Sequence, residues 1–347
     1  MKTLQEFQDY FERELRSKLV TSQAERDASR PYLWRWWRWV FAAAVVFSVL
    51  TGFADLPGQM TRKLNSLVWF ATLMVLPIIY WVRYNRWAAK YGKWEKNESL
   101  VPAIRFLAPE LEYRQLQHVS EERVRASRVF ESCGDIKEFY GDDHFAGMIG
   151  KTAVEFSEVR VAVWDGYLRN DKNEPVLRGY TGLFLAADFN KPLQHTTLVI
   201  PDVLEQHMGT EAAKFVSGLL AATRSLDKFV PEARRSASDL RPVRLEHLEF
   251  ERLFQVHCSD PVEAHYILTP DVMERIAAFR KSTGFALTLS FIGTSMHAFV
   301  HRGALFEADV NMVRTGFAVY QPYYEQLQHV FELVSVMNLN TRLWNKT

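Results

Sequence analysis

The sequence predicts an α+β protein: an N-terminal two-helix transmembrane hairpin, followed by a cytoplasmic mixed α/β domain built on mainly antiparallel sheet. Two observations predict this class. Two apolar stretches lie close together before residue 83: one is uncharged from Trp39 to Ala54 and is extended by Trp36 and Trp37 around Arg38, and the other is uncharged over 64–82. Beyond residue 99, alternating apolar and polar runs are separated by single helical segments without regular βα alternation. Of the 347 residues, 48% are hydrophobic and 24% charged, which excludes a disordered chain.

Residues 1–30 are predicted to form a cytoplasmic segment with an amphipathic helix. Thr3 and Glu6 fit a capping box, in which each side chain accepts a hydrogen bond from the other residue's backbone N–H. The polar face mixes both charge signs. This favours docking on protein, either the chain's own domain or a partner, over lying on anionic lipid. Apolar residues recur at intervals of three and four: Leu4, Phe7, Phe11, Leu15 and Leu19.

Residues 31–98 are predicted to form the membrane hairpin, with spans at about 36–54 and 64–82. The second stretch has 19 uncharged residues, and as a helix it would extend about 28 Å, close to a hydrocarbon thickness of about 30 Å. Burial of both helices in a soluble core is the alternative, and the aromatic and basic flanks argue against it. The residues expected at the membrane interface are Trp36, Trp37, Arg38, Trp39, Trp81, Arg83, Arg86 and Trp87.

Lysine and arginine residues near the span ends predict the orientation of the hairpin. Nine of these residues lie on the two outer flanks, four at positions 26–38 and five at positions 83–96. Only Arg62 and Lys63 lie in the connection 55–63. The positive-inside rule therefore places both termini in the cytoplasm. A cleavable signal peptide does not fit, because the first 30 residues are polar and charged.

Residues 99–347 are predicted to form a cytoplasmic α+β domain, as one body or as two halves separated by an exposed loop near 224–242. Residues 1–99 hold 15 Lys and Arg and 9 Asp and Glu, which leaves 27 and 32 for residues 100–347 and a net charge of about −5. This charge argues against nucleic acid as a partner. The expected strands are 153–164, 182–189, 196–200, 253–257, 264–268, and a hairpin of 285–291 with 296–301; the expected helices are 98–108, 203–221, 272–281 and 323–337.

The two cysteines, Cys133 and Cys258, have no neighbours at metal-ligand or redox-motif spacing. We therefore expect two reduced thiols, without a disulfide framework or a zinc site.

Four ordered sequence blocks are similar to a bacterial membrane-protein family known as the domain of unknown function number 3137. The resemblance covers about residues 130–347, and His265 stands where the family pattern leads us to expect Arg. It implies a membrane anchor, a cytoplasmic domain and a place in the bacterial inner membrane, without an established reaction. It also points to a LemA-like membrane protein as a partner. The blocks are 138–144 with 147–152 and 156–159, 182–184 with 187–191, 250–251 with 254, 259–260 and 263–270, and the closing Leu339-Asn340-Thr341-Arg342-Leu343-Trp344.

Three clusters of polar residues are candidates for chemistry. Asp142, Asp143 and His144 supply metal-ligand side chains, although adjacent residues beside a glycine more often form a turn or a cap. Asp188 and Lys191 could act as an acid/base pair, or they could end a strand before Pro192.

The third cluster combines carboxylates with a histidine: Asp260, Glu263 and His265. A His/carboxylate site is one interpretation. The simpler one is that Asp260 orders a turn with Pro261, while Glu263 pairs with a base such as Arg252.

The sequence contains no nucleophile elbow, phosphate-binding loop, dinucleotide fingerprint or zinc-protease motif, and no cofactor is expected. We therefore expect a membrane-anchored binding or scaffold module that contacts the lipid bilayer and a membrane-associated protein. An unfamiliar, hydrolase-like enzyme with a carboxylate-based site is the alternative. Convergence of Asp142, Asp188, Asp260 and Glu263 in one cleft would favour the enzyme, and their dispersal in turns would favour the module.

Overall fold

The computed structural model describes residues 1–53, 58–70, 76–131, 133–169, 175–189, 191–201, 239–303 and 316–337. The chain divides into two compact units. The sheet unit comprises Met1, residues 108–307 and residues 323–347, and the helical unit comprises residues 2–107 and 308–322. The α+β class is confirmed, because a large antiparallel sheet is combined with helices.

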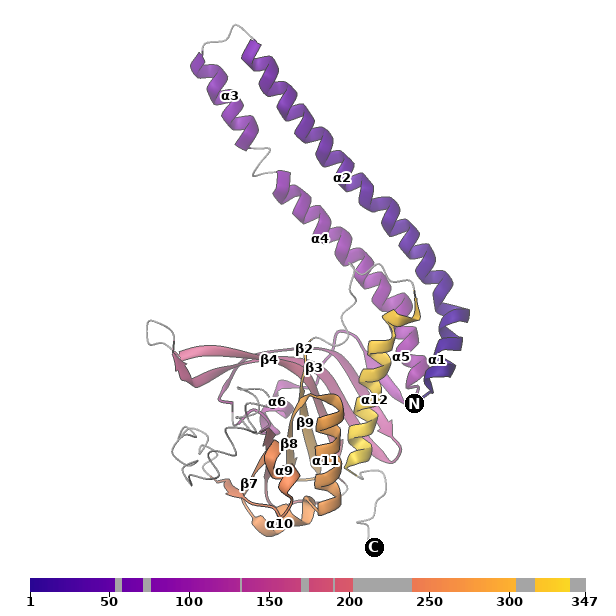
Figure 1. The fold of residues 1–347 in the computed structure, drawn as a ribbon, viewed down its shortest axis with the longest axis vertical. Coiled ribbons are helices and arrows are strands. Elements are labelled where there is room, and N and C mark those ends of the chain that lie inside the picture. Colours follow the sequence, from indigo (N-terminus) through magenta and orange to yellow (C-terminus); the bar gives the residue numbers. More distant parts are fainter. Residues whose placement is uncertain are drawn as a thin grey trace. The chain divides into compact units, whose positions relative to one another are not determined.

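Among the described residues, the sheet has nine strands in the order β1-β2-β3-β4-β9-β8-β5-β7-β6, and each pair of neighbours is antiparallel (Figure 1). The strands are β1 Leu111–Arg114, β2 Ile136–Ile149, β3 Thr152–Arg169, β4 Pro175–Asp188, β5 Thr197–Pro201, β6 Arg241–Val243, β7 Phe254–Cys258, β8 Ala286–Ile292 and β9 Ser295–His301. The helices of this unit are α6 Glu121–Ala126, α9 Leu248–Leu253, α10 Pro261–Ile267, α11 Pro270–Thr283 and α12 Gln321–Val336, which starts in the helical unit.

Both faces of the sheet are covered. Side chains of β3, β4 and β9 on one face pack against residues in and around α6, and this cluster includes Val124, Val161, Phe184 and Phe299. On the other face, α11 and α12 lie against β4 and β9 (Figure 1). Successive side chains of a strand point to opposite faces of the sheet, so the same strands contribute to the packing on both faces.

Helix α11 begins and ends as its sequence predicts. Thr269 is the N-cap, with its hydroxyl accepting from the Val272 N–H, and Pro270 is the first helical residue. Gly284 follows the helix with a left-handed backbone at φ 70°, which glycine adopts without a Cβ penalty.

The helical unit consists of α1 Leu4–Tyr10, a π-helical turn η1 Phe11–Leu15, α2 Arg16–Phe53, α3 Gly58–Phe70, α4 Leu76–Glu95, a second π-helical turn η3 Lys96–Leu100, α5 Val101–Leu107 and the short helix η6 Phe317–Val319. The long helix α2 runs beside α3 and α4 (Figure 1). Within the ranges given above, no helix has both the length and the hydropathy that crossing a membrane requires. The predicted spans are described only in part, because Ala54 and residues 71–75 lie outside those ranges.

The N-terminal amphipathic helix is confirmed, and it docks on the chain itself. Phe7 and Phe11 are buried, with their rings 5.3 Å and 5.6 Å from that of Phe317. Tyr10 stacks on Phe106 at 4.1 Å. The predicted capping box between Thr3 and Glu6 is present. The apolar stripe is thus satisfied by aromatic residues of the same unit.

Two local predictions are wrong. Residues 264–268 belong mostly to helix α10, because Asp260 caps a helix that opens with Pro261, and these signals override the strand propensity of Tyr266 and Ile267. Residues 142–144 lie in strand β2 and not in a turn. The helix expected at 203–221 and most of the loop expected at 224–242 lie outside the described residues, and Arg241–Val243 forms β6.

Candidate functional site

A cluster of three carboxylates forms where β2 bulges away from regular pairing with β3. The register shifts between Asp142 and Phe145, and Asp143 has a left-handed backbone with φ 54°. Asp142 pairs in register with Glu158 of β3. Carboxylate oxygens of Asp142, Asp143 and Glu158 all lie within 4.8 Å of one another, and both Asp143 and Glu158 are completely buried.

Neighbouring groups already bond to this cluster. The Tyr113 hydroxyl donates a hydrogen bond to Asp143, and burial together with the Asp143 charge raises the pKa of Tyr113 far above its ordinary value. The Arg160 guanidinium donates to Glu158 at 3.3 Å. Oxygen ligands of this kind could hold a hard cation such as Mg²⁺ or Ca²⁺. Without one, Arg160 offsets part of the negative charge, and the neutral Tyr113 hydroxyl stabilises Asp143 by its hydrogen bond.

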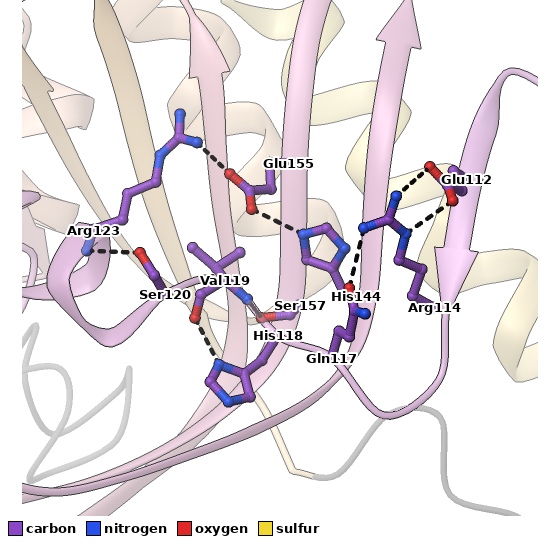
Figure 2. Close-up of polar contacts among 10 residues, drawn as sticks. All are labelled: Glu112, Arg114, Gln117, His118, Val119, Ser120, Arg123, His144, Glu155 and Ser157. Atoms are coloured by element: carbon purple, nitrogen blue, oxygen red, sulfur yellow. Dashed lines mark hydrogen bonds and ion pairs between the residues drawn. The ribbon is translucent and has the colours of Figure 1, made fainter.

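His144 does not join the three carboxylates. Its Nε2 lies 2.8 Å from Glu155 Oε1, and the second oxygen of Glu155 accepts from Arg123 of α6 (Figure 2). Ser157 of β3 bonds to the segment that precedes α6: its hydroxyl accepts a hydrogen bond from the Val119 N–H at 3.1 Å (Figure 2). These contacts tie the α6 region to the sheet, and His144 takes part in them.

Asp188 is the last residue of β4, where it pairs in register with Ser295. The Lys191 ammonium lies 3.1 Å from the centre of the Tyr266 ring, in a cation–π contact with α10. The arrangement agrees with strand-ending roles for this segment.

Asp260 and Glu263 bond to backbone. Asp260 caps α10 by accepting from the N–H groups of Val262 and Glu263, each at 3.2 Å. Glu263 accepts from the N–H groups of Gln194 and His195 at 3.1 Å and 2.8 Å, and so fastens the β4–β5 connection to α10. Arg252, which the sequence suggested for Glu263, is therefore not needed as its partner.

The Nδ1 of His265 lies 2.8 Å from the Pro261 carbonyl oxygen, within the same helix. This contact lies in the first turn of α10, beside the Asp260 cap.

The candidate residues fall into separate groups. Asp142 and Asp143 lie on β2, whereas Asp260 and Glu263 follow β7, and six strand steps separate these two strands in the sheet. At about 4.8 Å a step, that distance is roughly 29 Å. Sequence reasoning also missed Tyr113, Glu158 and Arg160, because the pairing of Asp142 with Glu158 depends on a register that no local motif encodes.

The expected interface residues lie at the ends of the predicted spans in α2 and α4. Arg38, Trp39, Trp81, Arg83 and Arg86 are exposed, and Trp87 is half-buried. The side chains of Trp36 and Trp37 lie outside those described.

A groove in the helical unit encloses about 420 Å³ between α2 and α4. Its lining carries both charge signs, from Lys18, Glu25, Lys90 and Glu98. Because these charges cancel, the groove favours neither an anion nor a cation.

Together, the sheet and its helical layers define an α+β domain joined to a helical unit, without a recognised catalytic constellation among the described residues. Residues 178–339 match the model of a family described as "Protein of unknown function (DUF3137)". This part of the chain therefore carries the domain of unknown function number 3137 that the sequence blocks resemble. The block at 138–159 lies before the matched residues.

Among solved structures, the chain is similar to the crystal structure of the mycobacterial trehalose monomycolate transport factor A, TtfA. The identity is 10%, the TM-score is 0.32, and the alignment covers 67% of this chain and 92% of that one. A similarity at this level carries over neither fold nor function. No match was found among the curated proteins.

Proposed function

We propose that the protein is a membrane-anchored binding module. A hairpin with spans at about 36–54 and 64–82 anchors it in the bacterial inner membrane, with both termini in the cytoplasm. The α+β domain is held beside the bilayer, where it binds a membrane-associated protein, for which a LemA-like membrane protein is the first candidate. Tethering raises the local concentration of such a partner.

The observation that carries the anchor is the exposure of large apolar side chains on α2, α3 and α4. Trp39 is 73% exposed, Leu67 67%, Ile78 61% and Trp81 63%. Burying one such side chain is worth about 1.5–3 kcal/mol, so a row of them left in water is costly. A bilayer, with a hydrocarbon core about 30 Å thick, removes this cost over the two apolar stretches at about 36–54 and 64–82.

Charged residues at the ends of this apolar region support the same orientation. Arg38, Arg83 and Arg86 are exposed at one end, where positive side chains meet the cytoplasmic surface of a membrane. The connection between the two spans, residues 55–63, carries only two positively charged residues, Arg62 and Lys63.

The roles of the acidic candidates support a binding module over a carboxylate-based hydrolase. Asp260 caps a helix and Glu263 holds a loop, and both act on backbone N–H groups. A hydrolase needs convergent polar groups around one reacting bond. Asp142 and Asp143 gather with Glu158, but this cluster lies six strand steps from the strand before Asp260 and Glu263, so the candidates do not share one cleft.

Cysteine labelling in intact cells tests the anchor. In a chain with Cys133→Ala and Cys258→Ala, a membrane-impermeant maleimide should label Gln59→Cys in intact cells. It should label Leu116→Cys, at a position that is 91% exposed, only after lysis. Labelling of Leu116→Cys in intact cells would contradict the proposed orientation. Release of the chain from membranes by alkaline carbonate would contradict the proposed anchor.

Affinity capture from detergent-solubilised membranes tests the partner. We expect a membrane-associated protein to co-purify with the full chain and to be lost when the sheet unit is unfolded by a core substitution. A folded variant that keeps its captured partners but has lost cellular function would contradict the binding proposal.

A further inference from the structure

Helix α4 carries a stripe of basic side chains directly beyond the second proposed span. All of them are exposed, and they follow one another at intervals of three and four residues: Arg83, Arg86, Lys90 and Lys93. At about 100° per residue, they fall within an arc of about 80° on the helix surface. No Asp or Glu occurs from residue 56 to residue 94. The stripe is therefore a continuous line of positive charge on one side of α4.

An aromatic stripe on the same helix explains why the basic stripe is left exposed. It is half-buried and consists of Tyr84, Trp87, Tyr91 and Trp94. The rings of Tyr84 and Trp87 are 5.7 Å apart, and those of Trp87 and Tyr91 are 5.3 Å apart. Tyr91 and Trp94 line the groove that α4 shares with α2. The aromatic stripe thus faces α2, and the basic stripe lies beside it on the helix, away from the groove.

The matching part of α2 differs in its charges. Its basic residues before the first proposed span are interspersed with Glu25 and Asp27. Unlike charges so close together offset each other's potential. The positive potential beside the proposed membrane surface is therefore strongest along α4.

The inference rests on the proposed anchor, in which α4 leaves the hydrocarbon core after residue 82. At about 1.5 Å per residue, the Cα of Lys93 lies about 17 Å beyond that point along the helix. The headgroup layer is roughly 5–8 Å thick, and a charge acts over a further Debye length of about 8 Å. Helical side chains tilt toward the helix N-terminus, which in α4 is the membrane end, so each charged group lies closer to the lipid than its own Cα. All the charges of the stripe are therefore within reach of lipid phosphates.

We propose that this basic stripe binds anionic phospholipids of the cytoplasmic leaflet and gathers them on the α4 side of the anchor. Ile79, which is 40% exposed, precedes Arg83 by four residues and so continues the same stripe into the proposed span. The stripe thus offers an apolar surface to the acyl chains and a cationic surface to the phosphate of one lipid. Guanidinium binds phosphate oxygens through paired hydrogen bonds, and ammonium binds them as a point charge. An acidic protein segment would match the charges but not the apolar surface above them.

Lipid retention by the full chain tests this assignment. The chain is reconstituted into vesicles of equal parts phosphatidylglycerol, which is anionic, and phosphatidylcholine, which is zwitterionic. It is then extracted in mild detergent, and the retained lipids are counted by native mass spectrometry. We expect phosphatidylglycerol to exceed phosphatidylcholine at least about threefold at about 50 mM salt, and the excess to fall at about 500 mM, because salt screens exposed charges.

Three double variants assign the excess to the stripe. Arg86→Gln with Lys90→Gln removes its middle and should bring the two lipids close to parity. Arg86→Lys with Lys90→Arg keeps both charges and should keep the excess. The matched control is Arg13→Gln with Lys18→Gln, which removes two exposed positive charges well before the first proposed span and should also keep the excess. Thermal unfolding followed by circular dichroism should give one midpoint for all these chains, because every substituted side chain is exposed.

Carbonate extraction separates a failure of this inference from a failure of the proposed anchor. A natural chain that stays in carbonate-washed membranes but retains both lipids equally would overturn the lipid assignment and leave the anchor standing. Equal loss of the excess in the control and in the Gln variant of the stripe would also overturn it, since retention would then follow net charge alone. Release of the natural chain by carbonate would overturn the anchor, and the inference with it.

Discussion

At the scale of single residues, the acidic side chains in the most family-like sequence block bond to backbone N–H groups. Asp260 accepts two such bonds at the start of α10, and Glu263 accepts two from the β4–β5 connection. Carboxylates in these positions satisfy donors that a helix start or a loop leaves unpaired. Their substitution should therefore change the free energy of unfolding, and function should change only as the folded fraction falls.

The first prediction concerns the cap of α10. Asp260→Ala should lower the free energy of unfolding by about 1 kcal/mol, whereas Asp260→Asn should retain most of the stability, because an amide oxygen can still cap. Urea unfolding followed by circular dichroism measures the difference. Asp271→Ala removes an exposed ion pair with Arg275 and should cost less than about 0.5 kcal/mol. Loss of function by a fully stable Asp260→Ala chain would instead indicate a chemical role.

The second prediction concerns the pH dependence of stability. Burial, with a smaller effect of Arg123, lowers the pKa of His297 to about 4. In the unfolded chain histidine titrates near about 6.5, so the unfolded state binds more protons between these values. The stability that neutral His297 contributes is fully present above pH 6.5 and is lost as the pH falls towards 4.

Urea midpoints at pH 7.5, 5.5 and 4.5 measure this loss, which should reach a few kcal/mol. His297→Gln cannot titrate, so it should show a shallower decline over the same range. Identical pH profiles for the natural chain and this variant would refute the assignment.

At the scale of elements, strand alternation and capping signals predicted much of the fold. The alternation at 153–164 lies in β3, and the Gly-Thr-Ser hairpin joins β8 to β9. The error at residues 142–144 arose where tertiary pairing overrides local signals. Asp142-Asp143-His144 resembles a turn, yet a bulge accommodates it within β2. The pairing of Asp142 with Glu158 follows from strand register, which is set over the whole sheet and not by neighbouring residues.

The third prediction uses two glycines of β4. A Cβ at Gly182 would lie 2.1 Å from the Val300 carbonyl oxygen, whereas nothing lies within 4 Å of one at Gly179. Gly182→Ala should therefore destabilise the sheet by about 1–3 kcal/mol as β4 and β9 are forced apart. Gly179→Ala should be neutral or slightly stabilising. Differential scanning calorimetry compares the two, and equal melting temperatures would contradict the close approach of these strands.

The fourth prediction concerns the docking of the N-terminal helix. Phe11 is 1% exposed and Leu4 is 42% exposed on the same apolar stripe. Phe11→Ala should cost about 3–5 kcal/mol in the helical unit, and Leu4→Ala less than about 1 kcal/mol. Limited proteolysis should release residues 1–20 faster in Phe11→Ala only. Equal cleavage rates in both variants would mean that the stripe does not hold the helix.

At the scale of the whole molecule, the described part of the sheet unit has its own core on both faces of the sheet. A unit with its own core can fold without the rest of the chain. The fifth prediction is therefore that a fragment of residues 98–347 gives a cooperative unfolding transition and remains in the supernatant after ultracentrifugation with membranes. The full chain should sediment with them. Sedimentation of the folded fragment would reveal a second membrane attachment.

The packing of Phe7 and Phe11 against Phe317 and Tyr320 has a consequence for biosynthesis. Residue 107 ends α5, and some 210 further residues must be translated before Phe317 exists. At about 5–20 residues per second, the ribosome needs roughly 10–40 s for this stretch. During that interval the first helices have been made, but the aromatic partners of Phe7 and Phe11 have not. The exposed phenylalanine stripe is then a natural target for a holding chaperone, and the helical unit can be completed only after residues 308–322 have been translated.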